Sequence, residues 1–280
     1  MKKLLFVLIT TIIISTQTGF VSAQDTACPE SQAVEKTVAE ELTVDQIVQR
    51  ANIAAYYKAD DGKASVKMTI TDKLGRTRER EFTILRKDMQ DGGEQKFYVY
   101  FNNPPDVRKM VYMVWKHIGK DDDRWLYLPA LDLVRRVAAS DRRSSFVGSH
   151  FVYEDVSGRN IDEDTHELME TDAKFYKLKN IPKNPDNVEF SSYIIWIDKT
   201  TFLPMKADYY DKQDKLYRIV EALEVKEIDG IPTVVKSRVS DLNSGGNTVA
   251  VFDKVTYNVG LKENIFSERY LRRPPRKWLK

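Results

Sequence analysis

The segment KFYVYFNNPPDVRKMVYMVWKHIGKDDDRWLYLP, residues 96–129, carries the clearest signal of the fold. Three runs of apolar and aromatic residues, KFYVYF, MVYMVWKH and RWLYL, are separated by Pro104-Pro105 and by the acidic turn Asp121-Asp122-Asp123. We interpret the runs as β-strands, because prolines and turn residues bound them. The first two runs are bulky at consecutive positions instead of alternating, so we expect those strands to be covered on both faces.

A period of two continues on both sides of this segment. Val66, Met68 and Ile70 alternate with polar residues upstream. Short connections downstream indicate antiparallel neighbours. The sequence therefore predicts a mainly β (α+β) protein with one antiparallel sheet of about ten or eleven strands, a sheet long enough that it must curl or split. The downstream strand candidates are residues 167–170, 174–178, 190–197, 205–210, 216–225, 233–240 and 248–257.

Two segments break the β pattern. Apolar residues follow Thr43 at helical spacing and Gln46 completes a capping box, so residues 44–57 are predicted to form an amphipathic helix. The stretch SDRRSSFVGSHFVYEDVSGR, residues 140–159, has neither period and carries buried-looking aromatic residues. Long irregular segments of this kind are often functional or cap an open surface. A curled sheet has a concave face that the helix or this segment can cover.

The N-terminus predicts export. Lys2-Lys3, the apolar run Leu4–Ile14 and Val21-Ser22-Ala23 form the pattern of a secretory signal peptide, residues 1–23, cleaved after Ala23; an uncleaved anchor is the alternative. Lys+Arg number 44 and Asp+Glu 42 in the 280 residues, and both surplus lysines belong to the signal peptide. The mature chain is therefore neutral, which argues against nonspecific binding of nucleic acid.

Cys28 is the only cysteine, which excludes an internal disulfide and cysteine-based metal sites. It lies in a polar, acidic stretch, residues 24–42, that we interpret as a linker. Acylation of Cys28 would anchor the protein to a membrane. The acidic Asp25 and the distance from the apolar run favour a free cysteine instead.

Residue types that carry catalysis or bind metals form no recognisable pattern. Arg142-Arg143 beside Glu154-Asp155 is compatible with an acid–base pair, but a structural ion pair is the preferred interpretation. Asp121–Asp123 is interpreted as a solvated turn. We expect no enzyme activity, no metal and no cofactor. The histidines also lack the spacing of metal ligands: His117, His150 and His166.

Soft, bulky apolar residues are concentrated in the first half of the sheet, Met113 and Trp115 among them. Methionine and aromatic side chains adapt to varied apolar ligands, so a curled sheet lined with them would form an acyl-chain pocket. The alternative is an ordinary core beneath the helix 44–57. The candidate ligand-binding residues are Met68, Phe97, Val99, Phe101, Met110, Tyr112, Val114, Phe146 and Phe151.

The stretch RWLYLPALDLVRRVAASDRRSSFVGSHFVYEDVSGR, residues 124–159, resembles the signature segment of the outer-membrane lipoprotein-sorting protein family, the LolA-like group with its treponemal branch. The stretch WIDKTTFLPMKADYYDKQDKLYR, residues 196–218, resembles a hairpin of the same family, and residues 258–266 fit its C-terminal pattern. The likeness covers nearly the whole mature chain. His150 departs from it, because we expect an acidic residue at this position.

The resemblance implies an unclosed LolA/LolB-like β-barrel over residues 43–273, with helices covering the concave face. It implies a periplasmic carrier, not an enzyme, which binds acyl chains of a lipid or lipoprotein and passes the cargo towards the outer membrane. The implied partners are an inner-membrane exporter of the RND/MMPL or ABC type and an outer-membrane acceptor. The alternatives are a cell-envelope interaction protein or adhesin that uses its surface, and an enzyme acting on exported lipids or glycans.

The C-terminus ends in a basic tail, residues 274–280, that contains Trp278. Two interpretations remain open at this stage. The tail is either a frayed, solvated end or a contact for an anionic membrane surface or an acidic partner.

Overall fold

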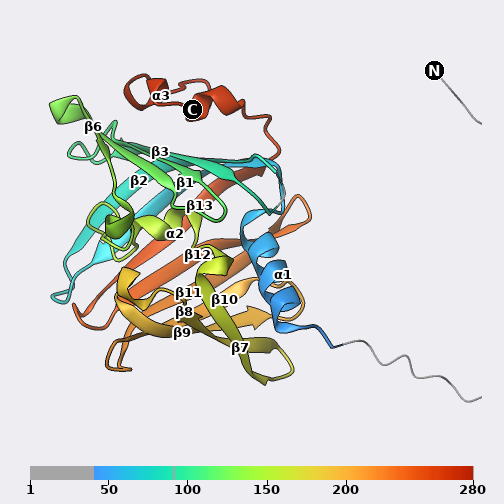
Figure 1. Cartoon of the computed structure of the whole chain (residues 1–280). Coiled ribbons are helices and arrows are strands. Elements are labelled where there is room, and N and C mark those ends of the chain that lie inside the picture. The colour runs from blue at the N-terminus through green and yellow to red at the C-terminus, as the bar shows by residue number, and fades with distance from the viewer. Residues whose placement is uncertain (1–40, 91, 280) are drawn as a thin grey trace, which may run out of the picture. The chain divides into compact units, whose positions relative to one another are not determined.

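The strands form one antiparallel sheet in the computed structural model, which describes residues 41–90 and 92–279 (Figure 1). The chain divides into two units, Met1–Glu41 and Leu42–Lys280, and the description below concerns the second. The predicted signal peptide, its cleavage site, Cys28 and residues 24–40 of the linker lie outside the described residues. Within the described part, no helix is both long and apolar enough to span a bilayer.

The unit contains three α-helices, five short 3₁₀ helices and thirteen strands within the described residues. The helices are α1 (Val44–Tyr56), α2 (Tyr153–Ser157) and α3 (Arg269–Arg272), with 3₁₀ turns at Pro129–Leu131, Ala139–Asp141, Ile161–Glu163, Pro185–Asn187 and Glu263–Phe266. The strands are β1 (Asp61–Thr71), β2 (Thr77–Asp88), β3 (Gln95–Asn103), β4 (Val111–Lys116), β5 (Asp123–Leu128), β6 (Leu133–Arg136), β7 (Asp164–Thr171), β8 (Phe175–Pro182), β9 (Phe190–Asp198), β10 (Pro204–Asp211), β11 (Leu216–Ile228), β12 (Ile231–Asp241) and β13 (Gly246–Tyr257).

The sheet curls without closing. Its strand order is β6-β5-β4-β3-β2-β1-β13-β12-β11-β10-β9-β8-β7, so the first and last strands of the chain pair in the middle, and β6 and β7 are the two edges. The connection between these edges, residues 137–163, contains α2; we call it the cap segment. The mainly β fold is confirmed. The expected ten or eleven strands are too few, because the sheet contains thirteen within the described residues.

Helix α1 forms where the sequence predicts it. The Thr43 side chain accepts a hydrogen bond from the Gln46 amide, and the Gln46 side chain accepts one from the Thr43 amide, which is the predicted capping box. The buried face of the helix, including Ile47, packs against Leu178 of β8 and Ile197 of β9. Helix α1 therefore covers the second half of the sheet, not the Met- and aromatic-rich first half.

Strands β2 to β5 are covered on both faces, which the sequence predicts for β3 and β4. On the inner face, aromatic residues such as Phe97 pack against Phe146 and Tyr153 of the cap segment. On the outer face, Met113 and Trp115 pack against residues that follow β13. The expectation that Met113 and Trp115 belong to the pocket-forming set is therefore wrong, because successive side chains on a strand point to opposite faces.

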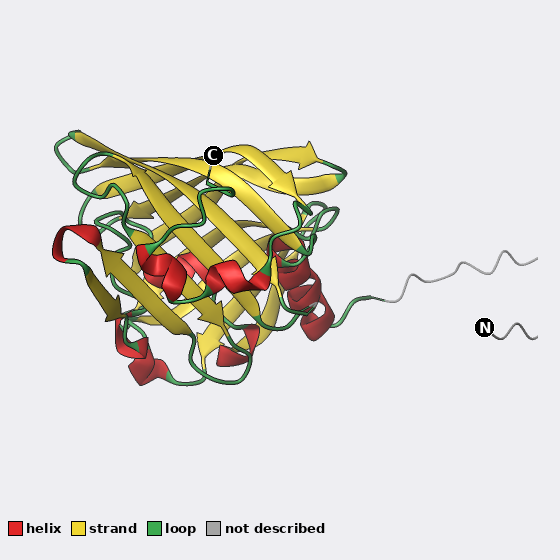
Figure 2. Ribbon diagram, turned by 90° about the horizontal axis from the view of Figure 1, so that it is seen from above, coloured by secondary structure: helices red, strands yellow, loops and turns green. Residues whose placement is uncertain are grey.

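The outer cover is the C-terminal segment, residues 258–279, which we call the strap (Figure 2). Leu261, Phe266 and Leu271 of the strap are buried against the outer face of the sheet. The end of the strap is packed, not frayed, because Pro275 is buried and Trp278 is half-buried against the same cluster. The continuous apolar runs at residues 96–101 and 110–117 are thus explained by two separate covers.

Asp61, at the start of β1, anchors the strap. The residue is 3% exposed. Its carboxylate accepts hydrogen bonds from the backbone amides of Val259, at 2.7 Å, and Leu261, at 2.6 Å. Two charge-assisted bonds of this kind fix the direction in which the chain leaves β13.

Asp61→Asn is expected to lower the free energy of unfolding by about 2 kcal/mol, because an amide cannot accept both bonds and leaves a buried backbone donor unpaired. Urea unfolding measures this change, and trypsin should then cut the strap faster at Arg269–Lys277. Asp60→Asn, at the neighbouring exposed carboxylate, is the control and should be neutral. Equal stability of Asp61→Asn and the wild type would contradict this anchoring role.

Candidate functional site: a concave apolar cavity

The concave face is hollow because small residues line up across it. Ala222 of β11 pairs with Ser237 of β12, Ser237 pairs with Ala250 of β13, and Ala250 pairs with Met68 of β1. Paired residues in an antiparallel sheet share a face, so this row presents three short side chains in succession to the interior. All three of these short side chains line the same space.

The resulting cavity has a volume of about 420 Å³. This volume lies within the range of ligand pockets, roughly 300–1,000 Å³. Its walls come from α1, the cap segment, β1–β3 and the far strands β11–β13. The apolar side chains that line it are Ala54, Ala55, Ala64, Val66, Met68, Phe82, Ile84, Phe97, Val99, Phe146, Phe151, Val156, Leu203, Pro204, Val220, Ala222, Ile231, Pro232, Val234, Ala250, Phe252 and Val255.

The nine residues predicted to bind ligand all belong to, or pack against, one inner cluster. Five of them line the cavity: Met68, Phe97, Val99, Phe146 and Phe151. The other four form the packed wall behind it: Phe101, Met110, Tyr112 and Val114. The centre of the Phe146 ring lies 5.8 Å from that of Phe101 and 5.5 Å from that of Tyr112. This cluster lies beneath the cap segment, not beneath α1 as the alternative interpretation assumed. Ligand binding by these residues stays a prediction.

Sequence reasoning missed the second wall. Val220, Ala222, Val234 and Phe252 come from strands β11 to β13, which carry no methionine or aromatic concentration comparable to β3 and β4. The available signal was the inward-facing small residues on these strands. They indicate a cavity only when the strand register is known.

Two carboxylates line the cavity, and each is paired with an arginine. Glu221 accepts from Arg238 at 2.7 Å on the neighbouring strand. Asp155 of α2 accepts from Arg218 of β11 at 2.5 Å, and also from the Val152 amide. Arg218 is buried, and its Nε and Nη1 atoms have no hydrogen-bond partner in the structure. The Asp155–Arg218 pair joins the cap segment to the opposite half of the sheet.

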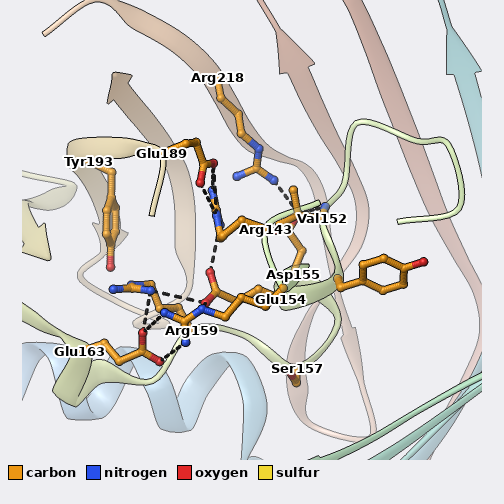
Figure 3. Close-up of polar contacts among 12 residues, drawn as sticks. Arg143, Val152, Glu154, Asp155, Ser157, Arg159, Glu163, Glu189, Tyr193 and Arg218 are labelled. Carbon is orange, nitrogen blue, oxygen red and sulfur yellow. Dashed lines mark hydrogen bonds and ion pairs between the residues drawn. The ribbon is translucent and has the colours of Figure 1, made fainter. Parts of the chain in front are cut away.

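A second ionic group holds the base of the cap segment (Figure 3). The buried Glu154 carboxylate contacts Arg143 at 2.9 Å, Arg142 at 3.3 Å and Arg159 at 3.4 Å. Burial alone raises the pKa of Glu154, but the positive charges of Arg143, Arg159 and Arg142 outweigh it and hold the pKa below its ordinary value. The predicted ion pairing of Arg142-Arg143 is therefore confirmed for Glu154, whereas Asp155 pairs with Arg218 instead.

Further carboxylates complete this ionic group. Arg143 also binds Glu189 at 2.8 Å, and Arg159 binds Asp164 at 2.8 Å, so the cap segment is tied to β7 and to the residue that precedes β9. The guanidinium groups of Arg143 and Arg159 lie over the Phe190 ring, at 5.1 Å and 5.4 Å. Aromatic faces and carboxylates together replace the water that these buried cations have lost.

His150 binds the tip of the cap segment to β13. Its backbone amide and its Nδ1 atom lie 3.0 Å and 2.8 Å from the Thr248 hydroxyl, and burial lowers the pKa of its ring. Gly246 is required beside it, because a Cβ there would come within 2.5 Å of the His150 ring and 2.7 Å of the Thr71 carbonyl oxygen. At the position where the sequence departs from the expected acid, the histidine therefore makes a structural contact.

The other candidate groups are structural as well. His117 bonds Glu94 and Asp123, and His166 bonds Asn180 and the Ile161 carbonyl. No group of three histidine, cysteine or acidic residues within the described ranges could hold a metal ion. The interpretation of Asp121–Asp123 as solvated is wrong for the middle residue, whose buried carboxylate binds Arg124 at 2.6 Å.

Lys116 is a buried cation at the junction of α1 and the cap segment. Its Nζ donates to the Ser157 carbonyl at 2.9 Å and lies 5.2 Å from the centre of the Tyr56 ring. Burial lowers the pKa of Lys116 to about 8, although the nearby carboxylates of Asp122, Glu154 and Glu163 oppose the shift. The charged form is thus disfavoured in the folded state.

This shift predicts a stability that rises in alkali. Above the folded pKa of about 8 and below the unfolded value of 10.5, the unfolded chain holds a proton that the folded chain has lost. Stability therefore rises with pH in this window. Relative to Lys116→Met, the wild type should gain about 2 kcal/mol between pH 8 and pH 10, as urea unfolding at each pH can measure. A difference that stays flat across this range would show that the ammonium group is hydrated.

Comparisons with known proteins agree with this architecture. A family model described as "Uncharacterized protein" matches residues 93–273. A DUF1329 family protein from Desulfovibrio piger is 32% identical, with coverage of 81% of this chain and 97% of that one and a TM-score of 0.73. A protein from Vibrio parahaemolyticus described as an outer membrane lipoprotein-sorting protein domain is 25% identical, with coverage of 81% and 97% and a TM-score of 0.73.

A LolA superfamily protein from Nitrosomonas europaea shares the fold. It is 17% identical, the alignment covers 82% of this chain and 100% of that one, and the TM-score is 0.64. No curated protein matches the sequence.

Proposed function

The chain belongs to the DUF1329 family and has the fold of the LolA superfamily, and from this premise we propose that it is a carrier of lipid or lipoprotein acyl chains. The cargo lies in the concave cavity, away from water. The single observation that carries the proposal is the apolar cavity of about 420 Å³ above the row Ala222–Ser237–Ala250.

The energetics favour a ligand with long apolar chains. Each methylene removed from water contributes about 0.8 kcal/mol. The many methylenes of a long acyl chain therefore offset the cost of immobilising the ligand. The lining is adaptable, because it mixes Met68 with aromatic rings and branched side chains. The lining is mainly apolar, although Lys58, Lys63 and Arg86 also border the cavity. The carboxylates of Asp155 and Glu221 are already paired with arginines.

Loading requires the cavity to open. Residues 54–56 of α1 and Phe146, Phe151 and Val156 of the cap segment all line it, so these two elements are the parts that move. The polar contacts that open with the cap segment are Asp155–Arg218 and His150–Thr248. The ionic group around Glu154 remains as a hinge.

The carrier operates in the periplasm in this proposal, after removal of residues 1–23. It receives its cargo from an inner-membrane exporter of the RND/MMPL or ABC type and delivers it to an acceptor at the outer membrane. The support comes from the signal-peptide pattern and from the similar Vibrio protein described as a lipoprotein-sorting domain.

The two alternative functions are less well supported. An adhesin that works through its surface needs no internal cavity, and the row of small residues would have no purpose in it. An enzyme acting on lipids or glycans needs an acid and a base free to exchange protons. Glu154 is instead enclosed by Arg142, Arg143 and Arg159, as a structural carboxylate would be.

Native mass spectrometry of the mature protein, purified gently from its own periplasm, tests the carrier. A stoichiometric lipid or acylated peptide is expected, and extraction with organic solvent followed by lipid analysis identifies it. Protein that is empty as purified and also ignores added phospholipid and fluorescent fatty acid would reject the carrier in favour of a surface-binding protein.

A further inference from the structure

A basic strip on the outer surface combines two segments that are distant in sequence. Arg272 of α3 binds Asp132, in the turn between β5 and β6, at 2.9 Å, and its guanidinium lies 5.9 Å from the Tyr127 ring. The strap and the β5–β6 hairpin are therefore side by side (Figure 1). The strip consists of Leu131 and Arg136 of the hairpin and Arg269, Arg272, Arg273, Arg276 and Lys277 of the strap. Leu133 and Arg135 do not belong to it, because they pair with Leu128 and Leu126 on the inner face of the sheet.

Positive charge is concentrated on this strip in a chain of nearly balanced charge. The strap sequence RYLRRPPRK, residues 269–277, contains five basic residues and no acidic one, although the whole chain has 44 basic and 42 acidic residues. All six cations of the strip are exposed. Arg136 and Arg272 pair with Asp123 and Asp132, whereas no carboxylate of the described residues pairs with Arg269, Arg273 or Arg276. The strip is thus a positive surface on which these three arginines have no carboxylate partner among the described residues.

An exposed leucine lies beside these charges. Leu131, at the hairpin tip, is 71% exposed. Trp278 of the strap is half-buried nearby, with the Lys277 ammonium 4.7 Å from the centre of its ring. Apolar tips flanked by Arg and Lys are the pattern of surfaces that enter the headgroup region of an anionic bilayer. An acidic protein would match the charges but would not account for the exposed Leu131.

We propose that the basic strip docks the protein on the surface of a bilayer rich in anionic phospholipid, with Leu131 inserted among the headgroups. This inference does not depend on the cavity. It concerns the outer face of β4–β6, whereas the cavity opens on the inner face of the sheet.

Vesicle sedimentation of the mature protein tests the docking. Binding is expected to vesicles of 30% phosphatidylglycerol in phosphatidylcholine and not to phosphatidylcholine alone, and it should weaken as salt is added. Arg269→Gln/Arg273→Gln/Arg276→Gln should reduce partitioning about 100-fold, at about fivefold for each cation near the surface. Lys212→Gln/Lys215→Gln/Lys226→Gln removes the same charge from the other half of the sheet and should bind like the wild type.

A second variant separates a membrane from an acidic protein. Leu131→Ser keeps every charge, so it should lower vesicle binding severalfold and leave retention on immobilised polyglutamate unchanged. The proposal is overturned if anionic vesicles are not bound, if the arginine and lysine triple variants lose equal binding, or if only polyglutamate is bound. The cavity variant Ala222→Phe should dock like the wild type, which keeps a failure of docking distinct from a failure of the carrier.

Discussion

Ala222→Phe is expected to weaken the binding of an acyl-chain ligand about 50-fold. Ala222 lies at the β11 end of the small-residue row and lines the cavity. A phenyl ring there occupies the space of about three ligand methylenes, which costs about 2.4 kcal/mol of burial. Displacement of a fluorescent fatty acid from the purified protein measures the loss.

The neighbouring residue provides a matched control. Leu223 is 41% exposed and does not line the cavity, so Leu223→Phe adds an aromatic ring to the same strand on the other face. It should bind the probe like the wild type. Unchanged binding by Ala222→Phe, with a native circular dichroism spectrum, would place the ligand elsewhere. Equal weakening in both variants would mean that the strand had been disturbed rather than the cavity filled.

The β fold was predictable because its signal is local. Alternation at Val66, Met68 and Ile70 and the capping box at Thr43 and Gln46 need only near neighbours in the sequence. The wall formed by Phe97 and other bulky residues was also predictable as apolar. Local patterns do not identify what covers each face of a strand. Whether Met113 and Trp115 or Tyr112 and Val114 face the interior therefore became clear only from the position of the strap.

The hollow itself could not be predicted in this way. A cavity arises from missing side-chain volume, and the alignment of Ala222, Ser237 and Ala250 depends on the pairing of three strands. The Asp155–Arg218 pair joins residues 63 positions apart for the same reason. Small residues are unremarkable one at a time, and only the register of the sheet brings them into one row.

Glu154→Gln is expected to have the largest effect on stability, about 3 kcal/mol in free energy of unfolding. The carboxylate of Glu154 contacts all three arginines of the ionic group. Removing one partner of a buried ion pair costs about 3–5 kcal/mol. The lower end applies here, because Glu163, Asp164 and Glu189 still compensate part of the arginine charge. The melting temperature should fall by about 6–12 °C.

Glu163→Gln is the matched control, because Glu163 contacts two of the same arginines but its side chain is 26% exposed. The variant should lose about 1 kcal/mol in free energy of unfolding, since water can solvate the arginine groups that lose their partner. A cost for Glu154→Gln no greater than that of Glu163→Gln would mean that the arginines are held mainly by the outer carboxylates and the Phe190 ring.

Acidification gives an independent reading of the same group. The folded pKa of Glu154 lies below its unfolded value, so the unfolded chain binds the proton first as the pH falls. The stability contributed by Glu154 is therefore complete above its unfolded pKa and is lost as the pH drops through the folded one. The difference between wild type and Glu154→Gln should stay constant above about pH 5 and shrink below about pH 4. Since this carboxylate fixes the base of the cap segment, limited proteolysis between Arg142 and Arg159 should accelerate in the same acidic range.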